Sequence, residues 1–164
     1  MASIMFQRVS KRYRDAIGVQ DLDLRIRDGE VFVFIGPSGC GKTTALRLIA
    51  GLEAPDSGAI LFDGEDMTEV APAERDIAMV FEGYALYPHW AVRQNLEFAL
   101  RLRHVPREET ARRVAEVAHA MELGDLLGRK PRSLATGEAQ SVAVGRAVIR
   151  DRPSVLLLDD ALSH

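Results

Sequence analysis

Polar and apolar residues alternate in the first part of the chain, and this alternation predicts strands. In the segment 20–27, Leu22, Leu24 and Ile26 are separated by polar residues, as in a strand that buries one face and exposes the other. The segment 4–10 has the same period. We therefore expect two half-buried strands near the N-terminus.

Two later runs are apolar without interruption. They cover 31–35, which follows the turn signal Asp28-Gly29, and 155–158. Strands that are covered on both faces of a largely parallel sheet have such runs, because neither face meets water. We expect 31–35 to be the central strand of the core and 155–158 to be a second buried strand.

Further along the chain, apolar residues at helical spacing and suitable end residues predict helices. The predicted helices cover 43–50, 92–102, 108–121 and 137–150. Gly51 is well placed to end the first of them. Short strands are predicted at 59–62 and 77–81, and the turn signal Asp63-Gly64 indicates a hairpin-like excursion after the first.

Composition and charge narrow the class of protein. The chain has 164 residues, 47% hydrophobic and 27% charged, which is ordinary for one soluble domain. The formal net charge of -3 gives no indication of nucleic acid as a partner. No apolar run reaches the roughly 20 residues that cross a bilayer, and no secretion signal is recognisable. We expect a cytoplasmic protein in a reducing compartment, since the single cysteine, Cys40, cannot form an internal disulfide.

A glycine-rich loop lies between the predicted central strand and the first predicted helix. It consists of Gly36, Pro37, Ser38, Gly39, Cys40, Gly41, Lys42 and Thr43, and Thr44 follows it. This is the full phosphate-loop (P-loop) pattern in its required context, and it predicts nucleotide binding. Backbone N–H groups would converge on the phosphates of ATP, with Lys42 at the terminal phosphates and the Thr43 hydroxyl on Mg²⁺. We expect Cys40 to be a small residue that fits the loop.

The second apolar run ends in a carboxylate. Asp159 follows 155–158 and, in a P-loop protein, would hold the magnesium ion and its water. It lies more than a hundred positions after Lys42, so a large insert separates the two elements. Small kinases and GTPases rarely carry so much chain there. A small-molecule kinase stays an alternative, although no arginine cluster in a recognisable lid supports it.

The P-loop, the segment 75–81 (Arg-Asp-Ile-Ala-Met-Val-Phe) and the segment 84–89 (Tyr-Ala-Leu-Tyr-Pro-His) together resemble ABC transporter ATPases of the maltose and glycerol-phosphate importer type. The similarity covers essentially the whole chain. It implies an α/β fold with a P-loop NTPase (RecA-like) core, N-terminal antiparallel β strands and an inserted helical subdomain, incomplete at the C-terminus.

The same resemblance implies one domain over residues 1–164. The core with its P-loop would occupy 1–87, and a mainly helical insert would occupy 88–135. The signature helix and the Walker B strand would follow in 136–164. The implied partners are membrane-spanning permease subunits and a second ATP-binding subunit, at the inner face of the cell membrane.

The resemblance also implies roles for residues outside the P-loop. Tyr13 matches in position the aromatic residue that stacks on adenine, which a flat ring can cover without hydrogen bonds. The segment 81–89 corresponds to the loop that touches the membrane subunits. The signature loop consists of Leu134, Ala135, Thr136, Gly137 and Glu138. In a head-to-tail dimer, this loop would cap ATP bound by the other subunit.

The sequence departs from the family at positions that carry chemistry. Glu82 stands in place of a glutamine; its carboxylate could ligate magnesium, but it adds negative charge beside the phosphates and Asp159. In the signature loop, Ala135 lacks the usual serine hydroxyl and Glu138 replaces a glutamine. Asp160 stands in place of the general-base glutamate and is one methylene shorter, and a misplacement of about 1 Å can cost on the order of a hundredfold in rate.

Two functions from different classes follow. The first is the ATP-binding subunit of an importer of sugars or similar solutes. Lys42 and Asp160 would be its catalytic residues, and Thr43, Glu82 and Asp159 its metal ligands. The second is a non-hydrolysing nucleotide-binding or regulatory remnant that pairs with an intact homologue, which the altered signature loop favours.

The family continues beyond Asp160 with a proline, an aspartate-bearing loop and a switch histidine. This sequence has Ala161 at the proline position and supplies no later strand before His164. No switch histidine can be assigned, and we expect a decayed or cut copy of the family's ATPase.

Overall fold

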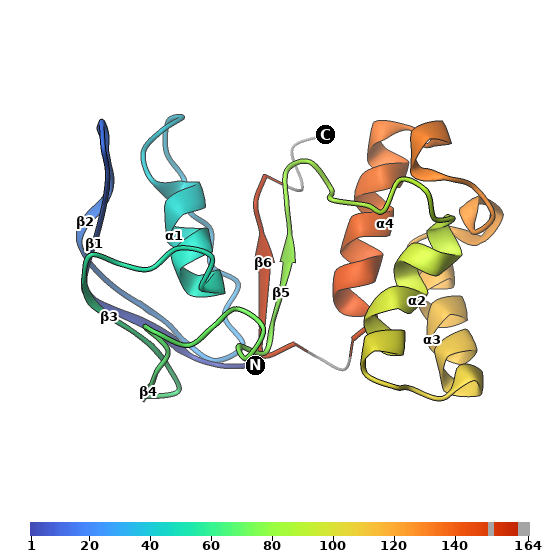
Figure 1. Ribbon diagram of the computed structural model, residues 1–164, viewed down its shortest axis with the longest axis horizontal. Helices are drawn as coiled ribbons and strands as arrows, with labels where there is room; N and C mark the ends of the chain where they lie inside the picture. The colour runs from blue at the N-terminus through green and yellow to red at the C-terminus, as the bar shows by residue number, and fades with distance from the viewer. Residues whose placement is uncertain (151–152, 161–164) are drawn as a thin grey trace. The chain divides into compact units, whose positions relative to one another are not determined.

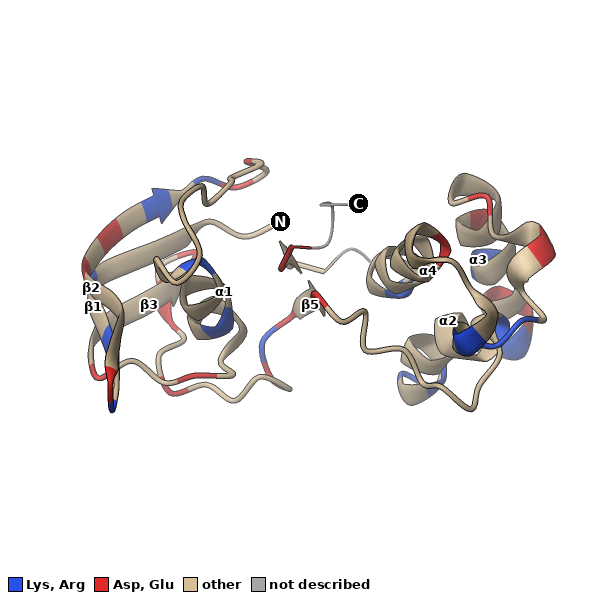
Figure 2. Cartoon of the chain, turned by 90° about the horizontal axis from the view of Figure 1, so that it is seen from above, with Lys and Arg blue, Asp and Glu red and all other residues tan. Residues whose placement is uncertain are grey.

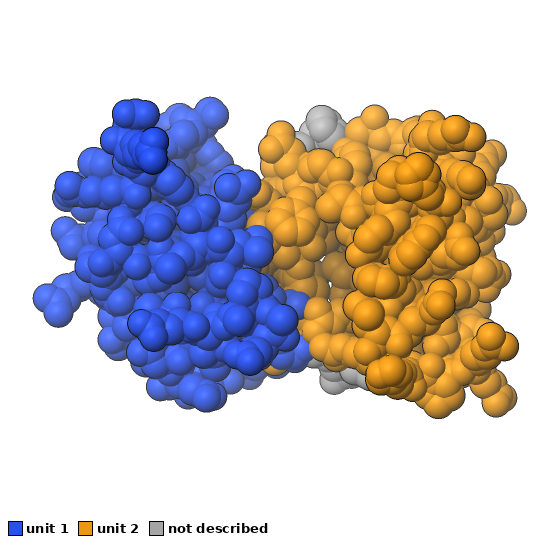
Figure 3. Space-filling model, viewed as in Figure 1, with its two compact units in different colours: residues 1–77 blue, residues 78–164 orange. Residues whose placement is uncertain are grey.

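The structure is a computed structural model that describes residues 1–150 and 153–160. Two compact units, residues 1–77 and 78–164, make up the chain and are coloured separately in Figure 3. The prediction of one domain in three parts stays a prediction. Ala161 and His164 lie outside the described residues.

The first unit contains a four-stranded antiparallel sheet (Figure 1). Its strands are β1 (Ile4–Tyr13), β2 (Ala16–Ile26), β3 (Ser57–Phe62) and β4 (Glu65–Asp66), in the order β2-β1-β3-β4. The two predicted N-terminal strands are confirmed, and both are longer than predicted. Their pairing continues to Tyr13 and Ala16, because β1 and β2 form one hairpin.

A second hairpin joins β3 to β4 through Asp63 and Gly64. Both residues are left-handed, with φ of 48° and 87°, and Phe62 pairs with Glu65 across the turn. Two successive left-handed residues match the twist of the flanking strands, and Asp-Gly is a preferred pair for such a turn. The predicted hairpin-like excursion is confirmed.

Helix α1 (Lys42–Ala50) lies against this sheet and supplies part of the core of the unit (Figure 2). The buried apolar side chains include Ile4, Phe6 and Val9 of β1, Ile60 and Phe62 of β3, and Ala45, Leu48 and Ile49 of α1. Gly51 ends the helix as predicted. Its left-handed backbone, with φ of 71°, lets the N–H of the next residue, Leu52, turn back to the Arg47 carbonyl at 2.9 Å.

The segment 31–35 does not form the central strand that its apolar run predicts. Val31, Val33 and Ile35 are 92%, 67% and 91% exposed. The two sheets that the described residues form do not include the segment. A strand needs a neighbour for its backbone N–H and C=O groups, and an apolar run does not by itself supply one. The prediction of a buried central strand is therefore wrong for the described structure.

The second unit has a two-stranded sheet and a group of helices. The sheet pairs β5 (Ile77–Val80), which begins at the unit boundary, with β6 (Val155–Leu158). The helices are α2 (Val92–Leu102), α3 (Arg107–Ala120) and α4 (Thr136–Val148), with the short 3-10 helices η1 (Gly124–Leu126) and η2 (Pro131–Ser133) between α3 and α4. All predicted helices are confirmed, and their ends shift by no more than two residues.

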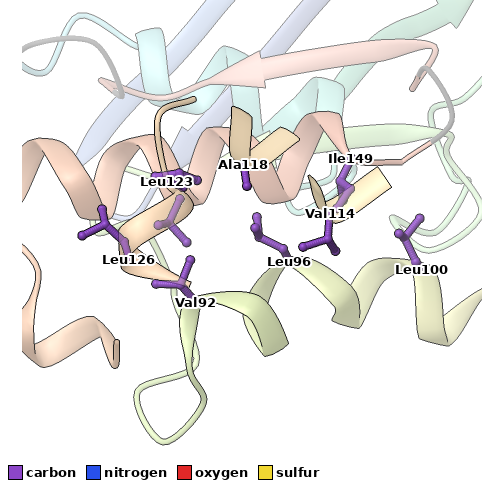
Figure 4. Close-up of a cluster of buried hydrophobic side chains, with 9 residues drawn as sticks. Val92, Leu96, Leu100, Val114, Ala118, Leu123, Leu126 and Ile149 are labelled. Carbon is purple, nitrogen blue, oxygen red and sulfur yellow. The ribbon is translucent and has the colours of Figure 1, made fainter. Parts of the chain in front are cut away.

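Apolar side chains from three helices form the core of the second unit (Figure 4). Val92, Leu96 and Leu100 of α2 are four residues apart, so they share one side of that helix. Val114 and Ala118 of α3, Leu123, Leu126, Val142 of α4 and Ile149 complete the cluster. Gly145 allows α4 to approach its neighbours closely, since a Cβ there would lie 3.3 Å from Leu96 Cδ2.

Candidate nucleotide-binding site

The P-loop leads directly into α1. Gly41 is the N-cap residue of this helix and has a φ of 99°, a left-handed conformation that glycine adopts without strain. The first turn, Lys42 to Thr44, contains no acid. The first backbone N–H groups of a helix have no partner inside it, and the helix dipole makes this end positive. This end of α1 is therefore suited to bind an anion such as a phosphate group.

The side chain of Lys42 lies across the loop. Its Nζ donates hydrogen bonds to the carbonyl oxygens of Gly36 and Pro37, each at 2.8 Å. These two bonds fix a positive charge among the backbone groups of the loop. The contact of this charge with the terminal phosphates stays a prediction.

Glycines hold the P-loop close to strand β2. A Cβ on Gly41 would lie 2.1 Å from the carbonyl oxygen of Gly18 in β2. A Cβ on Gly18 would in turn lie 2.8 Å from Thr44 Cγ2 and 2.9 Å from Tyr13 Cε2. Such distances leave no room for a side chain at either position. Gly18 therefore lies at the point where β2, the P-loop and Tyr13 meet.

Tyr13, the residue expected to stack on adenine, ends β1 beside this meeting point. The residue is 39% exposed, and the Lys11 ammonium lies 5.9 Å from the ring centroid. Lys11 also forms an ion pair with Asp56 at 3.3 Å, which limits where its charge can move. Tyr13 and Thr44 both lie beside Gly18. The adenine contact itself stays a prediction.

A buried arginine fixes the far end of α1. The side chain of Arg75 is only 4% exposed, and it donates to the carbonyl oxygens of Leu48 at 2.9 Å and Ile49 at 2.7 Å. It also donates to the Val70 carbonyl at 2.9 Å and to the carbonyl of Met67. Burial lowers the pKa of Arg75. A cation at a helix C-terminus is favourable, and this one ties the helix behind the P-loop to the segment before β5.

The predicted metal ligands fall in different units. Thr43 belongs to the first unit, whereas Glu82 and Asp159 belong to the second. In the second unit β5 and β6 end side by side, because the Asp159 N–H donates to the Val80 carbonyl at 2.9 Å. Glu82 and Asp159 thus follow neighbouring strand ends. Asp160, the proposed general base, has a left-handed backbone with φ of 50°.

No preformed cation cage is visible in the described part of the chain. Within residues 1–150 and 153–160, no group of three or more His, Cys, Asp or Glu side chains is close enough to hold a metal ion. Magnesium typically uses one or two carboxylates and completes its shell with water and phosphate oxygens. The protein ligands expected here are compatible with that type of site.

The described helices also include none that is long and apolar enough to cross a membrane.

The predicted signature loop surrounds the start of α4. Leu134 packs against the core cluster of the second unit, while Ala135, Thr136 and Gly137 are exposed. The Glu138 carboxylate reaches back and accepts a hydrogen bond from the Ala135 N–H at 2.8 Å. This end of α4 therefore already holds a negative charge of its own.

Sequence reasoning missed Gly18 and Arg75. An isolated glycine within a strand indicates that another backbone approaches closely, so Gly18 carried a usable signal. Arg75 gave no such signal, because its partners are carbonyl oxygens far away in the sequence.

Comparison with known proteins identifies the relatives of this chain. A family model described as ABC transporter matches residues 19–163. The osmoprotective compounds uptake ATP-binding protein GgtA of Synechocystis sp. is 50% identical over all of this chain and 45% of its own length. The sn-glycerol-3-phosphate import ATP-binding protein UgpC 1 of Rhizobium etli is also 50% identical, over 47% of its length. The chain spans about half the length of the curated relatives it matches.

Solved structures share the fold. The dimeric ATP-binding cassette MJ0796 in a post-hydrolysis state with ADP and Pi is 28% identical with a TM-score of 0.85, over 97% of this chain and 74% of that one. A second dimeric structure of the same cassette gives a TM-score of 0.89 at 28% identity, over 98% and 75% of the two chains. Together with the P-loop at the start of α1, these matches show that the chain belongs to the ABC transporter family and has the fold of its P-loop ATP-binding cassettes.

Proposed function

We propose that this chain binds Mg-ATP on the P-loop and serves as an ATP-binding subunit that couples ATP hydrolysis to the import of a solute. The observation that carries the proposal is the start of α1, where Gly41 and Gly18 keep the loop tight and Lys42 places a charge across it. The names of the relatives, which include a sn-glycerol-3-phosphate importer and an osmoprotectant importer, favour a carbohydrate or a similar polar solute.

The proposal gives each site residue a task. The N–H groups of the P-loop and the Lys42 ammonium bind the phosphates, and Tyr13 covers the adenine ring. The Thr43 hydroxyl, Glu82 and Asp159 would hold Mg²⁺, which neutralises phosphate charge when it is bound. Asp160 would orient and deprotonate the attacking water as general base.

The partners in this proposal are permease subunits and a second ATP-binding subunit. The relatives are named as import ATP-binding proteins, and the cassette with the shared fold is titled as dimeric. The chain would therefore work at the inner face of the cell membrane, docked onto membrane-spanning subunits. The segment around Tyr87 and Trp90 would contribute to that contact, because aromatic side chains are enriched at interfaces and Tyr87 is 38% exposed.

A second candidate function is a nucleotide-binding regulator that does not hydrolyse ATP. The specific observation in its favour is the Glu138 carboxylate at the N-terminal end of α4. A negative charge there opposes the γ-phosphate of ATP bound by a partner subunit, which this chain's signature loop would cap. Asp160 also favours a regulator that does not hydrolyse ATP, since its side chain is shorter than the glutamate that the family uses as general base.

One experiment separates the two candidates. Mg-ATP binding by calorimetry and steady-state phosphate release are measured on the same purified sample, with Lys42→Ala as the control. Lys42-dependent binding with turnover supports the transport ATPase, and Lys42-dependent binding without turnover supports the regulator. Binding that is absent, or unchanged in Lys42→Ala, would refute the proposal that the P-loop binds nucleotide.

A further inference from the structure

Four cations lie on the surface near the start of α2. Arg93 belongs to the first turn of this helix, Arg129 and Lys130 follow η1, and Arg132 lies in η2. The Ser133 N–H donates to the Lys130 carbonyl at 2.9 Å, so Arg132 stays in a tight turn next to Lys130. All four cations are exposed. Among the residues that the structure describes, none of the four forms an ion pair, so their charges are not neutralised by the chain itself.

Backbone hydrogen bonds hold the start of α2 beside the segment that follows η1. The Val92 N–H donates to the Arg129 carbonyl at 2.8 Å, and the Arg93 N–H donates to the Leu127 carbonyl at 3.0 Å. Below these bonds, Val92 and Leu126 belong to the same buried cluster (Figure 4). The two parts therefore form one continuous surface, and we call the four exposed cations on it the basic face.

The basic face attracts anions through its side chains rather than through the helix end. The N–H groups of Val92 and Arg93 are occupied by carbonyl oxygens, and the Ala91 N–H donates to Gln94 Oε1 at 2.9 Å. A single phosphate group at a helix start is normally held by such N–H groups. Long side chains without these donors are better suited to a surface that carries many negative charges.

Aromatic side chains adjoin the basic face. Trp90, which is partly exposed, comes two residues before α2. Its ring packs against the rings of Tyr87 and Phe98, with centroids 4.6 and 5.1 Å away. Tryptophan and tyrosine are enriched where a membrane meets water, at the level of the lipid headgroups. The best-formed hollows of the described residues include neither these rings nor the basic face, so a peptide would find no groove here.

We propose that the basic face binds the anionic phospholipids of a membrane surface, with Trp90 at the level of the headgroups. This contact goes beyond the proposed function, because it requires neither ATP nor a permease subunit. It continues the surface around Tyr87 and Trp90 that would contact the permease. The chain has a net charge of -3, so attraction to an anionic bilayer must come from a local patch. Each cation near such a bilayer strengthens binding about fivefold, so the four act together.

The double variant Arg129→Gln with Arg132→Gln tests the basic face in the full chain without nucleotide. Arg101→Gln with Arg107→Gln is the matched control, because it removes the same charge from exposed arginines at the end of α2 and the start of α3. Both double variants should keep the thermal midpoint of the unaltered chain, since all four arginines are exposed. In sedimentation with vesicles of phosphatidylcholine and phosphatidylglycerol, binding should fall about 25-fold in the first variant and stay within about twofold in the control. Added salt should weaken the binding of the unaltered chain.

Several outcomes would overturn the proposal. Equal losses in the two double variants would mean that only net charge matters. Equal binding to pure phosphatidylcholine vesicles would assign the contact to another exposed surface, such as 31–35. Equally tight binding to a double-stranded oligonucleotide would indicate a general attraction to polyanions.

The emission of Trp90, the single tryptophan of the chain, gives a second readout. It should shift to shorter wavelength when the unaltered chain binds the anionic vesicles, because the ring would leave water. An unchanged emission on bound vesicles would place the contact elsewhere on the chain and refute the proposal. Failure of the proposed function is distinct, since it would abolish Lys42-dependent binding of Mg-ATP and leave the vesicle result as it is.

Discussion

Helices α1 and α4 both begin after a loop, and each leaves the backbone N–H groups of its first turn without partners inside the helix. In α1 the N-cap is Gly41, and the first turn contains no acid. In α4 the Glu138 carboxylate turns back to the Ala135 N–H. The first helix end is therefore left positive for a ligand, whereas the second is neutralised by its own chain. We therefore expect the start of α1 to bind anions more strongly than the start of α4.

The two remaining helices show that α1 is the exception. In α2, the neutral Gln94 makes the same backward bond, with Oε1 accepting from the Ala91 N–H at 2.9 Å. In α3, the first turn holds Glu108 and Glu109. Among the four α-helices that the described residues form, α1 is the one whose first turn has neither an acid nor a glutamine. The lack of such a residue is the feature that would leave this helix end open to a phosphate group.

The largest effect is expected from a methyl group at the start of α1. Gly41→Ala places a Cβ 2.1 Å from the Gly18 carbonyl oxygen and forces alanine into a φ of 99°. The left-handed conformation alone costs about 1–2 kcal/mol, and the loop must also move away from β2. We expect the affinity for Mg-ATP, measured by calorimetry, to fall by about a hundredfold, which corresponds to about 2.7 kcal/mol.

Gly137→Ala provides the matched control at the start of α4. A Cβ there meets nothing within 4 Å, and the residue does not need a left-handed backbone. Alanine is the better helix former, so the thermal midpoint should stay the same or rise slightly. Equal losses of Mg-ATP affinity in both variants would contradict the contrast between the two helix ends.

The sequence could predict features that have a local pattern, but not those that depend on contacts between distant residues. The helices were predictable because their apolar residues recur at helical spacing and because Gly51 marks an end. The segment 31–35 was mispredicted, since an apolar run reports a tendency to be buried but not whether a neighbouring strand is present. The P-loop was predictable as a contiguous pattern. The contacts of Gly18 and Arg75 were not, because they depend on backbone atoms brought close only by the fold.

A smaller effect is expected when the charge at the start of α4 is removed. Glu138→Gln keeps an acceptor for the Ala135 N–H, as Gln94 does in α2, and deletes the interaction of the carboxylate with the helix dipole. The free energy of unfolding should fall by about 0.3–1 kcal/mol in urea titrations at low salt. Self-association that depends on Mg-ATP, followed by sedimentation, should become several-fold tighter, because a phosphate from a second copy would no longer face a carboxylate. Unchanged association would argue that Glu138 does not oppose a shared nucleotide.

The smallest effect is expected at the start of α3, where an acid is an ordinary surface stabiliser. Hydrogen bonds from Arg112 and Arg113 lower the pKa of Glu109 to about 2 from its usual 4.5. A lowered pKa in the folded state means that Glu109 contributes stability above about pH 4.5, and that this contribution is lost as the pH falls towards 2. The thermal midpoint of Glu109→Gln should therefore lie slightly below that of the unaltered chain at pH 7, and the gap should close on acidification. The gap should also shrink in high salt, because the ion pairs are exposed to solvent. A gap that widened with acid would mean that Glu109 acts through its protonated form, contrary to the role assigned to acids at helix starts.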